Sequence, residues 1–481
     1  MATGTYARSP AGSPGEVRRA GAMPRPGATP ETGPGAGTGA NAGANTGADT
    51  PTSSQARPAP LAKAAPARRL KLAMIVTEFP KTTETFIMRD VMDLSALDCD
   101  VRIFHLTHFN QRDTVHDFAR PTLGWATDYP YLMSTEVLAS LWRGLRGRDG
   151  RLRRIVKDIL RGCRHDPSML LKSFFILPKS LRIADELRRW GADHVHAAYA
   201  GHPTTAAWIA HRMTGIPFSL SSHAHDLFET QALLAEKLPE AAFVRTISDY
   251  NKAFILRHVP ALAAHPPEVI HVGTYPGAAP LPAPRGRAPF RLLYVGSLEE
   301  RKGVDLLLRA MSRLALKDWQ LDILGDGPER KRLEKLATTL PIRRHVTFHG
   351  RQRNETVQEA MRAASVLVVP SRIGARNQTE GLPTVIVEAF SHGLPVVATR
   401  LTGIPEIVRD GETGLLFEMN DIPGLMRAIS SIHADPQGAT RMAQAGRRLV
   451  EAEFDQCRNA ERLLGLIRQS VRPAPDARSI E

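Results

Sequence analysis

The sequence predicts an α/β protein with two parallel β-sheets, each wound with helices. Short apolar runs recur along residues 70–273 and again along residues 290–417, and stretches of helical periodicity separate them. A proline-rich segment divides the two arrays. Strands that alternate with helices form parallel sheets, because each crossover helix returns the chain in the same direction. Each array has roughly the size of one domain. We therefore expect two Rossmann-like domains that face each other across a cleft, where ligands bind beyond the carboxyl ends of the strands.

The first array begins at LKLAMIVTEFP, residues 70–80, where an apolar run ending in a turn is typical of a buried parallel strand. Helical stretches such as residues 204–215 lie between the runs that follow. We expect further strands within residues 100–106, 194–200, 218–226, 243–248 and 268–273. In the second array we expect strands at the start of residues 290–303 and within residues 319–327, 345–350, 365–371, 394–400 and 413–417.

Composition sets the predicted domain boundaries. Residues 1–68 are rich in Gly, Ala, Pro and Thr and cannot bury enough apolar surface to offset their ordering entropy, so we predict a disordered extension. The predicted N-terminal domain covers residues 69–275, and the proline-rich residues 276–289 are interpreted as a linker. The predicted C-terminal domain covers residues 290–470. Residues 471–481 are a predicted tail.

Charge and cysteine content restrict the class of protein. The net charge of +14 comes almost entirely from residues 1–69, at +5, and residues 131–190, at +8. Because the rest is nearly neutral, we expect no nucleic-acid partner that coats the whole molecule. No run of 18 apolar residues and no signal-peptide pattern appear. The scattered Cys99, Cys163 and Cys457 fit a reducing compartment, so we expect a cytoplasmic protein.

The stretch EGLPTVIVEAF, residues 380–390, places Glu388 inside an apolar run, where a carboxylate is costly to bury without a partner. Pro383 suits the first turn of a helix, which would put Glu380 before the helix and Glu388 about two turns into it. Free backbone N–H groups at that helix start attract phosphate. A carboxylate accepts two hydroxyl hydrogen bonds at once and therefore suits a ribose diol. The alternative is a strand, TVIVEAF, with Glu388 on its exposed face.

A second candidate element is GSLEERKG, residues 296–303, which follows a predicted strand. It brings Arg301 and Lys302 to the start of the helix VDLLLRAM, where a lysine can neutralise a diphosphate. A solvated charged loop is the alternative. The Gly-rich GDGPERKRLEKL, residues 325–336, is interpreted as a turn.

In the first array, two polar stretches lie at the ends of predicted strands. SSHAHDLF, residues 221–228, carries His223, His225 and Asp226. A zinc site is possible in principle, but no matching third ligand cluster is evident, so a cleft histidine is favoured over a capped core histidine. FPKTTETFIMRD, residues 79–90, carries Thr83 as a predicted helix N-cap, with Glu84 and Thr85 directed toward the cleft.

Together these motifs resemble the retaining glycosyltransferases of the GT-B fold, in family 4. The most specific part is EGLPTVIVEAFSHGLPVVATRLTGIPEIVRDGETGLLF, which carries the family's Glu-x7-Glu at Glu380 and Glu388. FPKTTETFI, HAHDLF and EGLP are similar to exopolysaccharide and colanic-acid-type members. Two departures stand out: Ser297 occupies a position where many members have Arg, and Leu382-Pro383 replaces Phe-Gly. Pro383 therefore lacks one amide donor for phosphate, and Arg301 is the candidate replacement for the missing arginine.

The resemblance implies roles for individual residues. Glu388 would bind the nucleotide ribose, Glu380 the donor sugar, Lys302 the phosphates, and His223 would lie near acceptor and donor sugar. The implied catalytic residues are His223, Glu380 and Lys302. The implied donor-binding residues are Gly296, Ser297, Arg301, Lys302, Glu380, Gly381, Leu382, Thr384 and Glu388. The implied acceptor-side residues are Glu84, Thr85 and Asp226.

The implied reaction is transfer of a hexosyl unit, with retention, from a nucleotide-diphosphate sugar to a saccharide or lipid-linked saccharide in surface or exopolysaccharide synthesis. The family needs no cofactor, and no Asp-x-Asp motif sits at a predicted strand end, so we expect no metal. Two alternatives remain open: a sugar-nucleotide epimerase or hydrolase of the same fold, and a nucleic-acid-binding protein without enzymatic activity, which would leave the glutamate pair unexplained.

Residues 131–190 mix Leu, Ile, Val and Trp with Arg at helical spacing. This pattern suits a helix that lies on an anionic lipid surface, such as the inner face of a membrane. An ordinary amphipathic surface helix is the alternative.

Overall fold

The computed structural model describes residues 68–79, 85–107, 117–127, 134–147, 150–275, 289–375 and 378–471. The predicted extension, linker and tail therefore lie outside the described residues, apart from Arg68, Pro289 and Val471 at their edges. The helix cap predicted at Thr83 and the predicted acceptor-side residue Glu84 also lie outside them. The described residues form two sheets within one compact unit of the chain.

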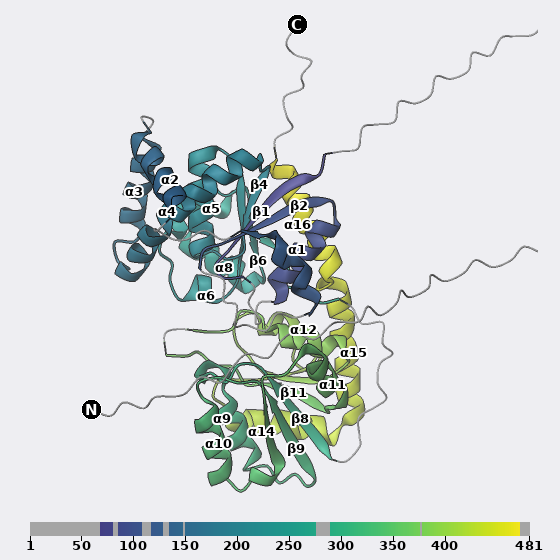
Figure 1. The fold of residues 1–481 in the computed structure, drawn as a ribbon. Helices are drawn as coiled ribbons and strands as arrows, with labels where there is room; N and C mark the ends of the chain where they lie inside the picture. The colour runs from purple at the N-terminus through teal and green to yellow at the C-terminus, as the bar shows by residue number, and fades with distance from the viewer. Residues whose placement is uncertain are drawn as a thin grey trace, which may run out of the picture. The chain divides into compact units, whose positions relative to one another are not determined.

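The first sheet is parallel throughout and has the strand order β3-β2-β1-β4-β5-β6-β7 (Figure 1). Its strands are β1 (Leu70–Val76), β2 (Cys99–His105), β3 (Ala126–Thr127), β4 (His194–Ala197), β5 (Phe218–Ser222), β6 (Val244–Thr246) and β7 (Glu268–Val269). Residues 72–76 of the central strand β1 are all buried, whichever way their side chains point. Burial on both faces explains why this strand is a continuous apolar run and not an alternating one.

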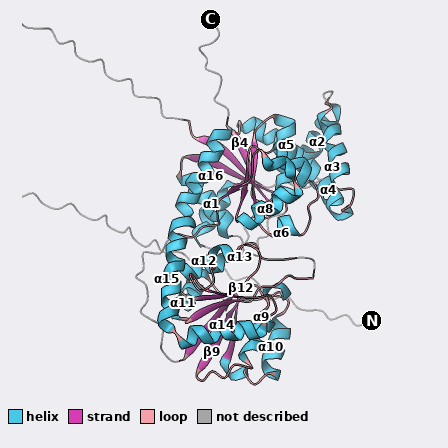
Figure 2. Ribbon diagram, turned by 180° about the vertical axis from the view of Figure 1, so that it is seen from behind, coloured by secondary structure: helices cyan, strands magenta, loops and turns pink. Residues whose placement is uncertain are grey.

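The second sheet is also parallel, with the strand order β10-β9-β8-β11-β12-β13 (Figure 2). Its strands are β8 (Phe290–Val295), β9 (Trp319–Leu324), β10 (Val346–Gly350), β11 (Val366–Val369), β12 (Val396–Thr399) and β13 (Leu415–Phe417). Each of the twelve predicted runs overlaps one of the observed strands, and β2 begins one residue before its run, at Cys99. The two-residue β3 is the one observed strand that no apolar run predicted. The predicted α/β class with two parallel sheets is confirmed.

Helices connect the strands of both sheets. Those of the first sheet are α1 (Thr85–Ala96), α2 (Thr135–Arg146), α3 (Arg151–Gly162), α4 (Pro167–Trp190), α5 (His202–Thr214), α6 (His225–Phe228), α7 (Leu234–Lys237) and α8 (Asp249–His258). The helices that follow are α9 (Val304–Met311), α10 (Arg330–Thr339), α11 (Asn354–Ala363), α12 (Thr384–Ser391), α13 (Ile404–Ile407), α14 (Ile422–Ala434), α15 (Pro436–Glu453) and α16 (Gln456–Ser470). Short 3-10 helices are η1 (Asp117–Trp125), η2 (Leu238–Glu240), η3 (Pro260–Ala263), η4 (Glu300–Lys302) and η5 (Arg343–His345).

Helix α16 follows the second sheet in sequence but packs on the first. Its apolar side chains Leu463, Leu464 and Ile467 belong to the core formed by β1 and α1, and both ribbon views place α16 beside α1 (Figures 1 and 2). The side chain of Gln456 donates hydrogen bonds to Asp90 at 3.0 Å and to Asp93 at 2.9 Å. The predicted boundaries assign α16 to the C-terminal domain, yet its buried face completes the core of the N-terminal sheet.

A separate question is whether any segment could span a bilayer. Within the described ranges, every helix is too short or too polar to cross a membrane.

Candidate active site

Residues 380–391 form a loop followed by a helix, and not a strand. Pro383 caps α12 with φ −64°, and its carbonyl accepts a hydrogen bond from the N–H of Ile386 at 3.0 Å. Ile386 and Val387 are buried in the core, whereas the Glu388 side chain keeps 24% of its surface exposed. The helix therefore resolves the apparent conflict in the sequence, because it separates the carboxylate from its apolar neighbours by rotation about its axis.

Glu380 forms an ion cluster with the turn after β8. Its carboxylate pairs with the guanidinium of Arg301 and lies 2.9 Å from Nζ of Lys302. Burial acts to raise the pKa of Glu380, but Lys302 and Arg301 lower it overall, so the carboxylate is ionised at neutral pH. The structure thus brings together Glu380, Arg301 and Lys302, three of the predicted donor-site residues, although the first lies about eighty positions from the other two.

The turn that presents these cations depends on close backbone packing. Gly303 has φ +66°, and a Cβ atom there would lie 1.9 Å from the carbonyl oxygen of Pro370, so only glycine fits. The N–H of Arg372 donates to the carbonyl of Arg301 at 2.8 Å, which ties the loop after β11 to the same turn. The predicted Gly296 and Ser297 begin this turn, and the carbonyl of Ser297 accepts a hydrogen bond from the hydroxyl of Tyr294 at 2.8 Å.

The next predicted donor residues meet the loop that carries His223. A Cβ atom on Gly381 would lie 3.2 Å from Cβ of Ala224 and 3.1 Å from Cδ1 of Ile247. Leu382 is buried in a core cluster that also contains Ile247. Thr384, the first residue of α12, is partly buried. Gly381 follows Glu380 in sequence, and Ala224 follows His223. The segment that carries Glu380 and the segment that carries His223 therefore lie next to each other.

His223 and His225 have different environments. Strand β5 ends at Ser222, so His223 is the first residue beyond it; it is buried, with its ring 4.7 Å from that of Phe86 and 5.1 Å from that of Tyr199. His225 is exposed at the start of α6. Burial, with smaller contributions from Arg245 and His225, lowers the pKa of His223 to about 3, so its imidazole is neutral at physiological pH.

Asp226 positions this loop through the backbone. Its carboxylate accepts hydrogen bonds from the N–H groups of His223 at 2.9 Å and Ala200 at 2.7 Å. Thr85, predicted on the acceptor side, begins α1 next to Phe86, whose ring contacts His223. Across the described ranges, no group of three or more His, Cys, Asp and Glu side chains has the arrangement of a metal site.

Two contacts near the site were not predicted. Arg89 of α1 lies 3.6 Å from the Glu388 carboxylate and donates to the carbonyl of Gly273 at 3.2 Å. Burial raises the pKa of Glu388, and Arg89 offsets part of that effect. Arg89 stands within the quoted motif FPKTTETFIMRD, where a charged pair interrupts the apolar face of the helix. That interruption is the signal that could have identified it.

The second contact that was not predicted is made by Glu406 of α13. Its carboxylate accepts hydrogen bonds from the N–H groups of Asp249 at 2.9 Å and Tyr250 at 2.8 Å, in the first turn of α8. Thr402, four residues earlier, donates to the carbonyl of Glu380 at 2.6 Å. Glu406 belongs to the quoted GIPEIV turn, to which the sequence assigned no role.

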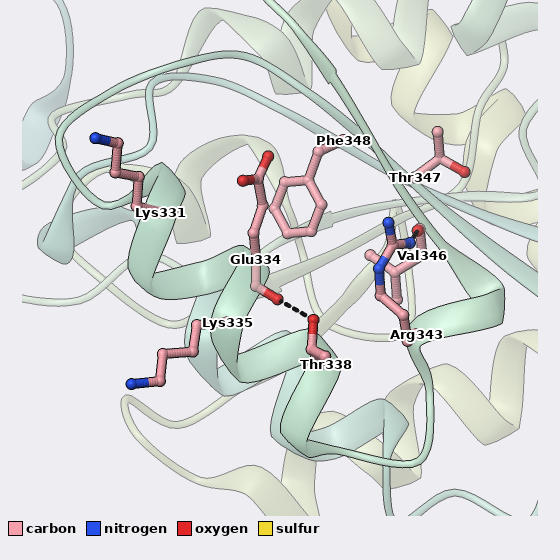
Figure 3. Close-up of a pocket in the computed structure, with 8 residues that line it drawn as sticks. All are labelled: Lys331, Glu334, Lys335, Thr338, Arg343, Val346, Thr347 and Phe348. Atoms are coloured by element: carbon pink, nitrogen blue, oxygen red, sulfur yellow. Dashed lines mark hydrogen bonds between the residues drawn. The ribbon is translucent and has the colours of Figure 1, made fainter.

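A hollow of about 630 Å³ lies elsewhere, between α10 and β10 (Figure 3). It is lined by Lys331, Glu334, Lys335, Thr338, Arg343, Val346, Thr347 and Phe348. These residues surround the amino end of β10, whereas ligands of parallel sheets bind at carboxyl ends. None of the predicted site residues lines it, and it is separate from the candidate active site.

With the two sheets and the ion cluster in place, comparison with known proteins identifies the class. Residues 284–449 match the family model described as glycosyl transferases group 1. The predicted resemblance is confirmed over this part of the chain. HepE from Anabaena, solved in complex with UDP, shares the fold with a TM-score of 0.62 and 15% identity, over 83% of this chain and 100% of that chain. The predicted GT-B fold is thereby confirmed.

Two curated relatives match over shorter ranges. A GDP-mannose-dependent alpha-(1-6)-phosphatidylinositol monomannoside mannosyltransferase from Mycolicibacterium smegmatis is 36% identical over 179 residues, 34% of this chain and 47% of that protein. WcaL of Escherichia coli, whose name refers to a glycosyltransferase of colanic acid biosynthesis, is 29% identical over 181 residues, 37% of this chain and 45% of that protein. The matched part of this chain thus spans less than half the length of these relatives.

Proposed function

We propose that the protein is a retaining glycosyltransferase that moves a hexosyl unit from a nucleotide-diphosphate sugar to a saccharide or lipid-linked saccharide acceptor in surface polysaccharide synthesis. The observation that carries the proposal is the buried cluster of Glu380 with Arg301 and Lys302. The family match of residues 284–449 and the UDP complex of HepE support a nucleotide-sugar donor. The names of WcaL and the mycobacterial relative support the acceptor class.

In the proposed reaction, the bond between the anomeric carbon and the leaving phosphate oxygen breaks while the acceptor hydroxyl attacks from the same face, and the hydroxyl proton passes to the departing phosphate oxygen. Negative charge grows on the diphosphate, and Lys302 and Arg301 stabilise it. Both cations are paired with Glu380 in the free protein, so the donor finds them already positioned. Glu380 then accepts hydrogen bonds from the donor sugar and Glu388 from the ribose.

We propose that His223 acts as a neutral hydrogen-bonding group toward the donor sugar or the acceptor. Because its pKa is about 3, the His223 imidazole is neutral at physiological pH and cannot act as a cationic acid. The His223 ring is buried, and the backbone N–H of His223 donates to the Asp226 carboxylate. We therefore propose that His223 contributes by orienting a substrate and not by transferring a proton.

We propose in addition that the side chains of Lys302 and Arg301 take the place of a metal ion at the diphosphate. Fixed cations at the point where charge develops can supply the stabilisation that Mg²⁺ gives in other phosphoryl sites. We further propose that the protein acts at an anionic membrane surface through residues 131–190. The name of the relative from Mycolicibacterium smegmatis includes phosphatidylinositol monomannoside, which supports this part of the proposal.

The test begins with a panel of nucleotide-sugars, scored by thermal stabilisation of the protein. The stabilising donor is then incubated with and without acceptors, in the presence and absence of EDTA, and products are identified. A glycosylated acceptor formed in EDTA supports the proposal. An epimerised or hydrolysed donor without acceptor supports the alternative reading, and a strict need for Mg²⁺ or Mn²⁺ contradicts the cation role of Lys302.

A matched pair of variants sharpens this experiment. Lys302→Ala should abolish most transfer, because it removes one of the two cations from the diphosphate site. Lys331→Ala removes an exposed lysine from the separate hollow between α10 and β10 and should leave transfer unchanged.

A further inference from the structure

Helix α5 packs on the strands β1, β4 and β5 of the first sheet, α3 and α4 pack against α5, and α2 packs against α4. Both ribbon views show α2, α3 and α4 next to one another (Figures 1 and 2). Helix α3 turns Leu152, Ile155 and Ile159 into the core. Of its two other apolar side chains, Val156 is partly buried and Leu160 is 49% exposed. The helix therefore has apolar surface that the described part of the chain leaves exposed.

Exposed apolar side chains concentrate on these three helices. Of the ten large hydrophobic side chains exposed in the described residues, six lie on α2, α3 and α4, and the other four are scattered. The six are Leu138, Trp142, Leu145, Leu160, Leu171 and Phe175. Single exposed apolar residues are ordinary, but a cluster of this kind marks a binding surface.

An apolar groove of about 470 Å³ opens on one side of α3. Its volume lies within the range of ligand pockets, roughly 300–1,000 Å³. Aliphatic side chains form most of its wall: Leu141, Leu145, Leu152, Val156, Leu160 and Leu177. The charged residues that line it are Arg153 and Lys157, and none of its described lining residues is acidic.

A cationic hollow of about 580 Å³ lies on the adjoining side of α3. It is lined by Arg151, Arg154, Lys157, Asp158, Arg161, Arg212 and Glu240. The two acids are engaged by Arg212, which lies 2.6 Å from Asp158 and 2.5 Å from Glu240. Arg161 also lies 3.1 Å from Asp158 and 3.6 Å from Glu236. The residues that line the hollow comprise five cations and two carboxylates, so the net charge of the lining is positive. Lys157 lines both the hollow and the apolar groove.

We propose that α3 binds an anionic phospholipid of the membrane, with a hydrocarbon chain in the apolar groove and the phosphate headgroup in the cationic hollow. An apolar groove and a cationic hollow joined at one lysine match the two ends of such a molecule. Burial of methylene groups and attraction between basic side chains and anionic headgroups both contribute to binding. The inference rests on the proposed work at a membrane surface and specifies the surface and the lipid class.

Calorimetric titration with dihexanoylphosphatidylglycerol, below its micellar concentration, tests the inference on the full chain. We expect binding, and a loss of at least tenfold in affinity for Leu145→Asp combined with Leu160→Asp. Leu171→Asp is the matched control, because Leu171 is 72% exposed on α4 and lines neither hollow. We expect a similar loss for Arg154→Gln combined with Lys157→Gln, and none for the exposed Lys172→Gln.

The headgroup and chain are tested separately. Glycerol 3-phosphate and dihexanoylphosphatidylcholine should each bind at least tenfold more weakly, because one lacks the chain and the other the net negative charge. Equal binding of glycerol 3-phosphate would reduce the site to a phosphate site and overturn the proposal, as would equal binding of the choline lipid or an equal loss in Leu171→Asp. Sedimentation with phosphatidylcholine vesicles, with and without phosphatidylglycerol, must show binding to the anionic vesicles alone.

The same variants separate this inference from the proposed function. Nucleotide-sugar stabilisation should be the same in all of them as in the unmodified protein. Failure of every nucleotide-sugar to stabilise the unmodified protein would contradict the glycosyltransferase proposal and leave the lipid measurements to be judged on their own.

Discussion

The two glutamates of the EGLPTVIVEAF stretch lie in opposite electrostatic environments. Glu380 faces Lys302 and Arg301, which lower its pKa below the ordinary value. Glu388 faces one arginine, Arg89, at 3.6 Å, and burial raises its pKa. Glu380 is therefore fixed in the free protein, whereas Glu388 has a weaker partner that hydroxyl groups of a ligand can replace.

We expect Glu388→Ala to weaken donor binding and to leave the fold intact. A hydrogen bond to a charged group contributes roughly 1.5–3 kcal/mol, so the dissociation constant should rise by about tenfold or more. Calorimetric titration of the donor nucleotide measures this. Glu355→Ala, at an exposed position of α11, is the control. Unchanged affinity in a folded Glu388→Ala protein would exclude the ribose role.

The two histidines after β5 should differ strongly in their effect on rate. We expect His223→Ala to lower turnover about 100- to 1000-fold, as for a hydrogen-bonding group that acts in the transition state, and His225→Ala to do little. Initial rates of both variants measure this. A fast His223→Ala and an inactive His225→Ala would show that the motif was aligned two residues out of place.

Because His223 is buried against Phe86 and Tyr199, its loss could also disturb packing. His223→Asn keeps a polar side chain at the position, and its unfolding midpoint distinguishes lost chemistry from lost stability. If His223 acts while neutral, the rate should also show no ionisation near the ordinary histidine pKa of about 6.5.

At the scale of elements, strands β4 and β5 share a buried ladder of histidines and serines. The ring nitrogens of His194 lie 2.9 Å from the hydroxyl of Ser470 and 2.7 Å from that of Ser219. Those of His196 lie 2.8 Å from the hydroxyls of Ser219 and Ser221. Burial lowers the pKa of both histidines to about 3. His196 adds to this effect at His194, and Arg245 adds to it at His196. The ladder therefore exists with both rings neutral.

This ladder predicts a loss of stability in mild acid. Below pH 6.5 the unfolded chain takes up protons on both histidines, and the folded protein does not until about pH 3. The contribution of the two neutral histidines to the free energy of unfolding is therefore fully present above pH 6.5. It falls toward pH 3, by up to about 1.36 kcal/mol per pH unit for each histidine. Urea unfolding at pH 7.5, 6 and 5 measures the slope. His194→Gln combined with His196→Gln should make the slope shallower, with His223 still contributing to it, and an unchanged slope would contradict the assignment.

The elements differ in how far the sequence could define them. Apolar runs predicted every strand region except the two-residue β3, because burial on both faces leaves a local pattern. Pro383 likewise predicted the start of α12. The family resemblance assigned Lys302 and Glu380 to one donor site, and the structure shows that the two side chains form an ion pair. Arg89 with Glu388 and Glu406 with α8 could not be predicted in the same way. Those contacts depend on which distant segments meet, and no local period records that.

At the scale of the whole molecule, α16 should stabilise the sheet that lies far from it in sequence. Ile467 is fully buried in the core of β1 and α1. We expect Ile467→Ala to cost roughly 2–5 kcal/mol, measured by urea unfolding, and the exposed Gln469→Ala to cost little. Hydrogen exchange should accelerate in β1 and α1. Acceleration confined to residues 290–417 would contradict this coupling.

The crossing of α16 also has a consequence for biosynthesis. A ribosome that has released β7 at Val269 must still translate the chain to Gln456 before α16 begins, which takes roughly 10–40 s at roughly 5–20 residues per second. Throughout that interval the face of α1 that will receive Leu463, Leu464 and Ile467 remains open to solvent and to chaperones. The segment that is made first is therefore completed only after the second sheet has emerged, and translation speed through residues 290–455 sets how long the nascent protein stays exposed.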